Sequence, residues 1–160
     1  DLFAAADDDA VQAAQQPGVG CVYPQQVDAH GQPQDHARRL PTPGALLRRY
    51  LGGAARRRAR VAAPDWANAA LLLFRSVAYQ RIQGFDEAYH MYCEDVDICL
   101  RLQLAGYLLA EAQDACVVHA GQRASHRQWR HLGWHLRSLW RLWHSPAYQR
   151  FQQNHARRVG

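Results

Sequence analysis

Acidic side chains gather in the stretch GFDEAYHMYCEDVDICLRLQLAGY, residues 84–107. Glu94 and Asp95 stand directly before a run of apolar residues, so we expect them in the first turn of a helix, at the edge of the core and beside a cleft. Free backbone N–H groups in that turn would lower the pKa of a carboxyl group and keep it ionised. An ionised carboxylate beside a cleft can accept the proton of a hydroxyl group whose oxygen attacks an electrophile. The alternative is a helix start whose acids only cap and solvate the helix.

The helix that carries these acids is predicted to run from about Glu94 to Ala105, with Gly106 just beyond its end. Asp97 and Arg101 are four residues apart and can pair on one face of it. Its valine, cysteine and leucine side chains supply a wide apolar surface that the protein can bury.

Strands and helices are predicted to alternate along the rest of the chain, as in an α/β fold. We expect strands over residues 19–23, 66–74 and 116–119. We expect helices over residues 7–16, near Leu46, over 77–82 with Ser76 as the N-cap, over 125–143, and from Pro146 to about Arg157. Residues 1–124 then form one domain and residues 125–160 a C-terminal helical segment.

The composition favours a folded, basic protein. The 160 residues carry 19 basic side chains, all of them Arg, against 14 acidic ones, which gives a formal net charge of +5. That balance favours anionic partners such as a nucleoside diphosphate, nucleic acid or an acidic membrane. The four cysteines are too sparse for a secreted disulfide scaffold, no signal peptide is visible, and no apolar run could span a bilayer. We therefore expect a cytoplasmic protein, with the inner face of the membrane as the alternative location.

Three stretches follow one another between Trp66 and Ser125: WANAALLLFR, QGFDEAYHMYCEDVDICLRLQLAGY and ACVVHAG. Together with VGCVYPQQVDAHG and RRLPTP upstream, they resemble the C-terminal half of the catalytic domain of glycosyltransferase family 2, particularly its bacterial rhamnosyltransferase-like members. Ala69 and Gln83 stand where that family usually has glycine. The resemblance implies a GT-A (Rossmann-like) fold, with a mixed sheet flanked by helices, and a role in polysaccharide synthesis at the cell envelope.

The same resemblance implies an inverting transfer of sugar from a nucleotide-sugar donor to a glycan or lipid-linked acceptor. Asp95 would be the catalytic base, and Glu94 would orient the acceptor or hold the local network. The residues that it implies in substrate binding are Trp66, Asn68, Asp86, Glu87 and Arg101. His119 would lie near the diphosphate or a metal ion, and the expected cofactor is a divalent cation, Mg or Mn.

The nucleotide pocket and the Asp-x-Asp metal motif of that family belong to an N-terminal half that the sequence does not match. Residues 7–9 read Asp-Asp-Asp, but they lie in a predicted helix and not at the end of a strand. We therefore expect the acceptor half of such an enzyme. The alternative is a non-catalytic module that binds a glycan or an anionic surface.

Two other groups of residues invite different interpretations. Cys93, Cys99, Cys116 and His119 could bind zinc, or the cysteines could be small buried apolar residues.

In the C-terminal segment, tryptophans and leucines can form one helical stripe, with most arginines outside it. These stripe residues are Trp129, Leu132, Leu136, Leu139, Trp140 and Trp143. The stripe fits a helix packed on the domain or an interfacial helix at an anionic membrane. Nucleic acid is a weaker alternative, because no recognised nucleic-acid motif occurs.

Overall fold

The fold centres on a three-stranded mixed sheet. The structure is a computed structural model that describes residues 11–51, 63–119 and 129–159. Strand β1 (Val19–Val27) lies between β4 (Leu73–Phe74), which is antiparallel to it, and β5 (Leu108–Val118), which is parallel to it. A separate antiparallel pair joins β2 (Ala37–Arg38) to β3 (Trp66–Ala67).

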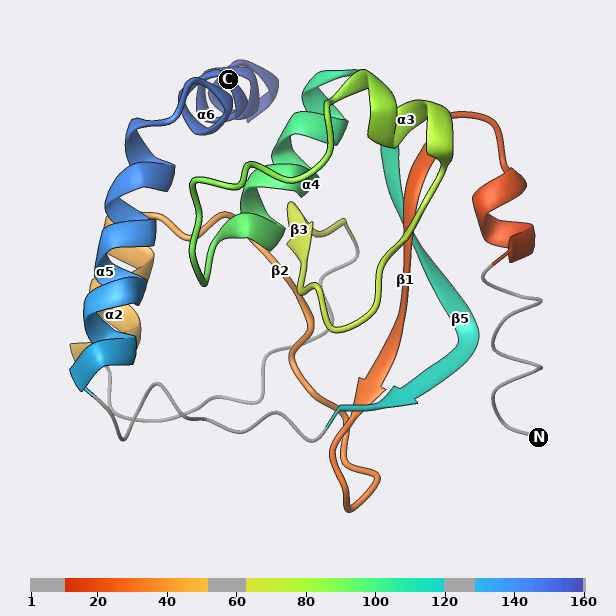
Figure 1. The fold of residues 1–160 in the computed structure, drawn as a ribbon, viewed down its shortest axis with the longest axis horizontal. Helices are drawn as coiled ribbons and strands as arrows, with labels where there is room; N and C mark the ends of the chain where they lie inside the picture. Colours follow the sequence, from red (N-terminus) through yellow and green to blue (C-terminus); the bar gives the residue numbers. More distant parts are fainter. Residues whose placement is uncertain (1–10, 52–62, 120–128, 160) are drawn as a thin grey trace.

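Helices lie against this sheet and against one another. They are α2 (Pro43–Leu51), α3 (Ser76–Arg81), α4 (Glu94–Leu104), α5 (Trp129–His144) and α6 (Pro146–Val159). Helix α4 contacts β1, β5, β3 and α6, and Figure 1 shows it between the long strands and the pair formed by α5 and α6. The predicted α/β class, with a mixed sheet flanked by helices, is confirmed. In the described ranges, no helix has both the length and the apolar character that a bilayer crossing needs.

The first part of β1 is buried on both faces, which explains why residues 19–23 read as a continuous apolar run. Cys21 packs with Ala78 and Leu102, whereas Val19 and Val22 belong to a second cluster that includes Ala112 of β5. Gly20 fits close against Tyr107, because a Cβ atom at position 20 would lie 2.6 Å from the Tyr107 Cβ.

The main apolar core surrounds α4. Val96, Ile98 and Leu100 of this helix pack with Leu142 of α5 and Phe151 of α6 in one cluster. The two C-terminal helices therefore complete the core on which the acid-bearing helix rests. Truncation of such a buried side chain to alanine typically costs about 2–5 kcal/mol.

Several predicted boundaries are wrong for identifiable reasons. The single strand expected over 66–74 is two short strands, because the Asn68 side chain accepts a hydrogen bond from the Ala70 N–H (3.3 Å) and turns the chain. Strand β5 begins at Leu108 and not at Cys116, and its pairing skips residues 113–115, since Pro24 pairs with Ala112 and Gln25 with Cys116.

Other predictions shift by one or a few residues. Ser76 is the first residue of α3, and the N-cap position belongs to Arg75, whose side chain makes no capping bond. Gly106 follows α4 with a φ of 90°, as expected. The first predicted helix is described only over residues 11–15, so Asp7, Asp8 and Asp9 lie outside the described residues, as do residues 125–128 of the predicted C-terminal helix.

Candidate active site

The turn that leads into α4 has an unusual backbone. Tyr92 (φ 71°) and Cys93 (φ 67°) both adopt the left-handed conformation, and Cys93 is the N-cap of the helix. Such a conformation costs a non-glycine residue about 1–3 kcal/mol and persists only where the surroundings enforce it. The chain thus turns sharply and places Glu94 and Asp95 in the first turn of α4, where the sequence predicted them.

Two side chains of helix α5 hydrogen-bond to this turn. The hydroxyl of Tyr92 hydrogen-bonds to Nδ1 of His131 (3.0 Å), and the Ser138 hydroxyl donates to the carbonyl oxygen of Met91 (2.7 Å). Both partners come from one side of α5. No pattern in the sequence indicates this role of the C-terminal helix.

Asp95 is partly buried at the mouth of α4. Its Oδ1 accepts a hydrogen bond from the Val96 N–H at 2.8 Å. Burial, followed by repulsion from the Glu94 carboxylate, raises the pKa of Asp95 to about 7, although the Val96 N–H and the charge of Arg38 act in the opposite direction. The prediction that the helix start would lower this pKa is therefore wrong, because desolvation outweighs the backbone N–H groups. Roughly half of such carboxyl groups are ionised at neutral pH, which suits a general base.

Glu94 carries an unsatisfied oxygen beside Asp95. Its Oε2 atom is buried and has no hydrogen-bond partner in the described part of the chain. A buried polar atom without a partner costs about 1–3 kcal/mol. A hydroxyl group of a ligand would supply the missing donor.

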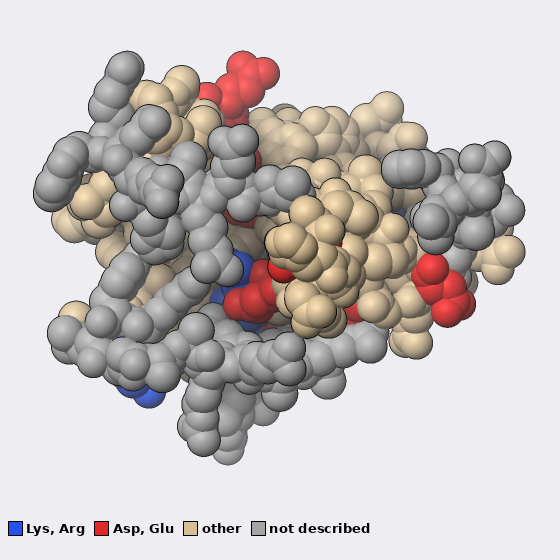
Figure 2. All heavy atoms as spheres, turned by 90° about the horizontal axis from the view of Figure 1, so that it is seen from below, with Lys and Arg blue, Asp and Glu red and all other residues tan. Residues whose placement is uncertain are grey.

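Arg38 and Trp66 lie side by side on the paired strands β2 and β3. The Arg38 guanidinium stands over the Trp66 ring, 5.3 Å from its centroid, and Nε1 of Trp66 donates to the carbonyl oxygen of Arg39 (3.0 Å). The positive charge of Arg38 acts to lower the pKa of Asp95. Figure 2 shows basic and acidic side chains next to each other near the centre of the face seen from below.

Asp65, next to Trp66, is a buried carboxylate that the sequence analysis missed. Its Oδ2 accepts from the Leu40 N–H (2.7 Å), and its Oδ1 lies 3.6 Å from an Arg39 nitrogen. This carboxylate fixes the segment after β2. The sequence signals for Arg38 and Asp65 were the stretches RRLPTP and PDW, whose significance depends on a strand pairing that spacing does not show.

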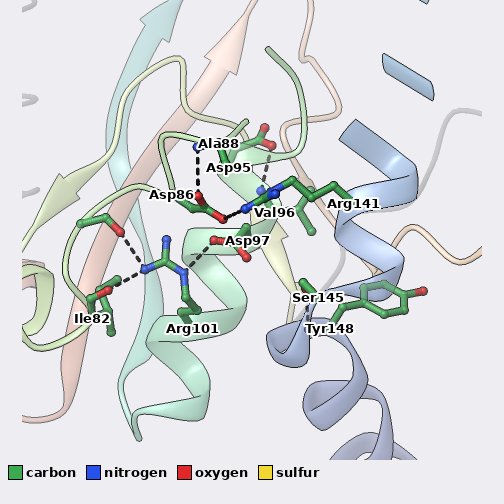
Figure 3. Close-up of polar contacts among 11 residues, drawn as sticks. Ile82, Asp86, Ala88, Asp95, Val96, Asp97, Arg101, Arg141, Ser145 and Tyr148 are labelled. Atoms are coloured by element: carbon green, nitrogen blue, oxygen red, sulfur yellow. Dashed lines mark hydrogen bonds and ion pairs between the residues drawn. The ribbon is translucent and has the colours of Figure 1, made fainter. Parts of the chain in front are cut away.

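Asp86 bonds to helix α5. Its carboxylate accepts from the Ala88 N–H (3.0 Å) and from Arg141 (2.9 Å), as Figure 3 shows. The Arg141 guanidinium also stands over the ring of Tyr89. Partial desolvation acts to raise the pKa of Asp86, but the bonds from Arg141 and Ala88 prevail and lower it. Glu87, its neighbour, is exposed.

Arg101 is held by protein groups. Its Nε pairs with Asp97 at 2.7 Å, which confirms the predicted pairing, and its Nη1 donates to the carbonyl oxygens of Ile82 (2.6 Å) and Gly84 (2.7 Å). Figure 3 shows these bonds of Arg101, which join α4 to the loop that follows α3. Substrate binding by Asp86, Glu87 and Arg101 stays a prediction, and the contacts of Arg101 assign it a structural task.

Asn68 and His119 are distant in sequence from Glu94 and Asp95 at the start of α4. Asn68 accepts a hydrogen bond from Nε2 of Gln26 (2.5 Å) through its side-chain oxygen. His119 follows β5, and its Nδ1 is buried without a partner among the described residues.

The described residues do not assemble a metal centre. Within residues 11–51, 63–119 and 129–159, no three His, Cys, Asp or Glu side chains are grouped so that they could hold an ion. Cys99 is buried in the core, and its thiol donates to the Ala67 carbonyl oxygen (3.7 Å). A single histidine nitrogen is a poor match for Mg or Mn, which prefer oxygen ligands, so the described residues alone do not fit the expected cation.

Part of the chain is similar to known rhamnosyltransferases. No family model matches the chain, and no solved structure matches it. The rhamnosyltransferase WbbL of Escherichia coli strain K12 is 37% identical over 78 residues, which are 48% of this chain and 30% of WbbL. The N-acetylglucosaminyl-diphospho-decaprenol L-rhamnosyltransferases of two Mycobacterium tuberculosis strains are 44% identical over 54 residues, which are 34% of this chain and 18% of theirs. The matched part therefore spans less than a third of these relatives, and over that part the chain is rhamnosyltransferase-like.

Proposed function

We propose that this chain, about half of which is rhamnosyltransferase-like, is the acceptor half of an inverting glycosyltransferase of family 2 with a GT-A fold. It transfers a sugar, rhamnose in the first instance, from a nucleotide-sugar to a glycan or lipid-linked acceptor. The observation that carries the proposal is the carboxyl group of Asp95 at the mouth of α4, whose pKa is raised to about 7.

In the proposed reaction Asp95 acts as the general base. The acceptor hydroxyl gives its proton to the Asp95 carboxylate, and its oxygen forms the new bond to the anomeric carbon of the donor sugar. The bond from that carbon to the diphosphate oxygen breaks, and the leaving nucleoside diphosphate keeps the electron pair. Because attack and departure take place on opposite faces of the sugar, one base produces inversion.

Neighbouring groups support this role. The buried Oε2 of Glu94 lacks a donor among the described residues, so it can accept a hydrogen bond from an acceptor hydroxyl and orient it beside Asp95. Trp66 is buried in the core, bonded to the Arg39 carbonyl oxygen and covered by Arg38, so it holds the Arg38 guanidinium in place for the site. Positive charge opposite the leaving diphosphate would stabilise the transition state.

The divalent cation stays a prediction. When bound, the cation would supply positive charge that stabilises the leaving diphosphate. Since the described residues do not form a site for it, the roles of Asp95, Glu94 and Trp66 are derived without it. A cytoplasmic location likewise stays a prediction.

The test compares Asp95→Asn with Asp114→Asn, an exposed acid of β5 that serves as the matched acid-to-amide control. Both changes are made in the full-length protein, which is assayed for transfer from nucleotide-linked sugars to a lipid-linked acceptor, with and without Mg or Mn. We expect Asp95→Asn to lose at least about a thousandfold in kcat, since it loses its proton acceptor, while Asp114→Asn keeps the activity. Retained turnover in Asp95→Asn would overturn the proposed base.

A non-catalytic binding module is the second candidate, because the matched part covers only 30% of WbbL. In that case no donor is consumed, and Asp95→Asn binds glycans as well as the unchanged chain does. Glycan-array binding combined with an assay of donor consumption distinguishes the two functions, since only the transferase consumes donor.

A further inference from the structure

Helix α5 presents an apolar stripe to solvent. Leu132, Leu136 and Trp140 follow one another at intervals of four residues, and their exposed fractions are 40%, 58% and 65%. The other side of the same helix buries Leu139 and Leu142 in the core. The sequence grouped Leu139 with the stripe, but the structure divides the apolar residues of α5 between two sides.

The surroundings of this stripe are basic. Arg137 is exposed and lies on the turn between Leu136 and Trp140. The described helices α5 and α6 contain no Asp or Glu, and their exposed arginines are Arg137, Arg141, Arg150 and Arg157, of which Arg141 pairs with Asp86. A protein partner of mixed charge would not require such an imbalance, but an anionic surface would match it.

We propose that this side of α5 docks on an anionic lipid bilayer. Leu132, Leu136 and Trp140 enter the boundary between head groups and acyl chains, where indole rings are favoured, and Arg137 lies among the lipid phosphates. Attraction between basic side chains and anionic lipids adds to the apolar contribution and weakens with salt. This inference goes beyond the proposed function, because it assigns an anionic membrane as the binding partner of α5.

The position of α5 gives this docking a consequence for the site. Figure 1 shows α5 at the outer edge of the molecule, and its bonds from His131 and Ser138 hold the turn before Glu94. One helix therefore touches the bilayer with one side and the acid-bearing turn with another. Because the two bonding residues lie nearly opposite the stripe on α5, docking would leave one helix diameter, about 10 Å, between the bilayer and the turn before Glu94. A lipid-linked acceptor would present its sugar across that distance.

The experiment measures binding of the full chain to vesicles of pure phosphatidylcholine and to vesicles that contain phosphatidylglycerol. We expect binding to the anionic vesicles only, with an affinity that falls at least tenfold when the salt is raised from low to high concentration. Leu136→Gln combined with Trp140→Gln should weaken binding about a hundredfold, and Arg137→Gln about threefold. The matched control is Val77→Gln, which changes an equally exposed apolar residue on α3 and should leave binding unchanged.

Two outcomes would overturn the proposal. Equal binding of the Leu136 and Trp140 variants to anionic vesicles would remove the apolar stripe from the contact. A concentration-dependent dimer that these same variants abolish, without vesicle binding by the unchanged chain, would show that a second copy covers the stripe. Vesicle binding is measured without donor sugar, so a failure of the proposed transfer leaves it intact, and Asp95→Asn should bind vesicles normally.

Discussion

Asp95 lies in an environment that acts on its pKa in two directions. The Val96 N–H at the helix start favours the ionised form, but burial and the neighbouring Glu94 favour the protonated form and prevail. A carboxyl group that is costly to ionise in the folded protein is a better proton acceptor than one at the surface. The cost of ionising Asp95 must also affect the free energy of unfolding.

Asp95→Asn should therefore stabilise the protein at high pH. The native pKa of Asp95 is about 7, above its ordinary value of 3.8, so the folded state binds more protons between these values and loses stability as the pH rises through that window. Above pH 7 the full cost is present, and Asn removes it. With allowance for partial exposure, we expect the variant to gain about 2–3 kcal/mol at pH 8 and almost nothing near pH 3. Urea unfolding at both pH values measures this, and an equal difference at both would contradict the cause.

Gln83 and Gly84 offer a matched pair of substitutions. Both have a positive φ (62° and 68°), but only at Gly84 would a Cβ atom collide with a neighbour, 2.8 Å from the Tyr79 hydroxyl. Gln83→Gly should be neutral or stabilise the fold by up to about 1 kcal/mol, because glycine adopts this conformation without strain. Gly84→Ala should destabilise it by about 2–4 kcal/mol. Thermal unfolding measures both, and a stabilising Gly84→Ala would show that the turn is differently built.

At the scale of elements, Arg101 joins α4 to the loop after α3. The guanidinium satisfies the buried Asp97 carboxylate and two backbone carbonyl oxygens at once. Burial raises the pKa of Asp97, and the Arg101 bond counteracts the rise. The pair therefore fixes the approach of the loop to the site.

Loss of Arg101 should be costly because it strands a buried charge. We expect Arg101→Gln to destabilise the fold by about 3 kcal/mol, whereas the double variant with Asp97→Asn should lose less than the sum of the single changes. Chemical unfolding of the four proteins gives the coupling energy. Strict additivity would contradict the pairing.

The sequence predicted elements well where their residues repeat at a helical spacing. The start of α4 at Glu94 and the Asp97–Arg101 pair followed from local spacing alone. The polar residues within β5 concealed its first part, because a strand paired in parallel with distant β1 is stabilised by contacts that local spacing does not contain. For the same reason the sequence placed Asp95 at the helix start but assigned its pKa the wrong direction, since burial depends on what packs over the helix mouth.

At the scale of the whole molecule, the four thiols report whether the core is intact. Cys21, Cys93 and Cys99 are buried and Cys116 is exposed, and none is in a disulfide. Burial raises the pKa of Cys99 to about 12 and also raises those of Cys21 and Cys93, so these thiols are doubly protected from alkylation.

A thiol reagent should thus modify one cysteine rapidly in the native protein and all four after unfolding. Cys116→Ser should abolish the rapid phase and leave the slow phase unchanged. Mass spectrometry of the alkylated peptides identifies the sites. Rapid modification of Cys93 would show that the turn before Glu94 opens in solution.

The two left-handed residues before Glu94 limit what a fragment of this protein can do. The Cβ atoms of Tyr92 and Cys93 disfavour that conformation, and the hydrogen bonds from α5 to the turn offset the cost. A synthetic peptide of residues 84–107 would contain every acid of the stretch yet point them in unrelated directions. A design that places this acid pair in another scaffold must therefore include helix α5 as well.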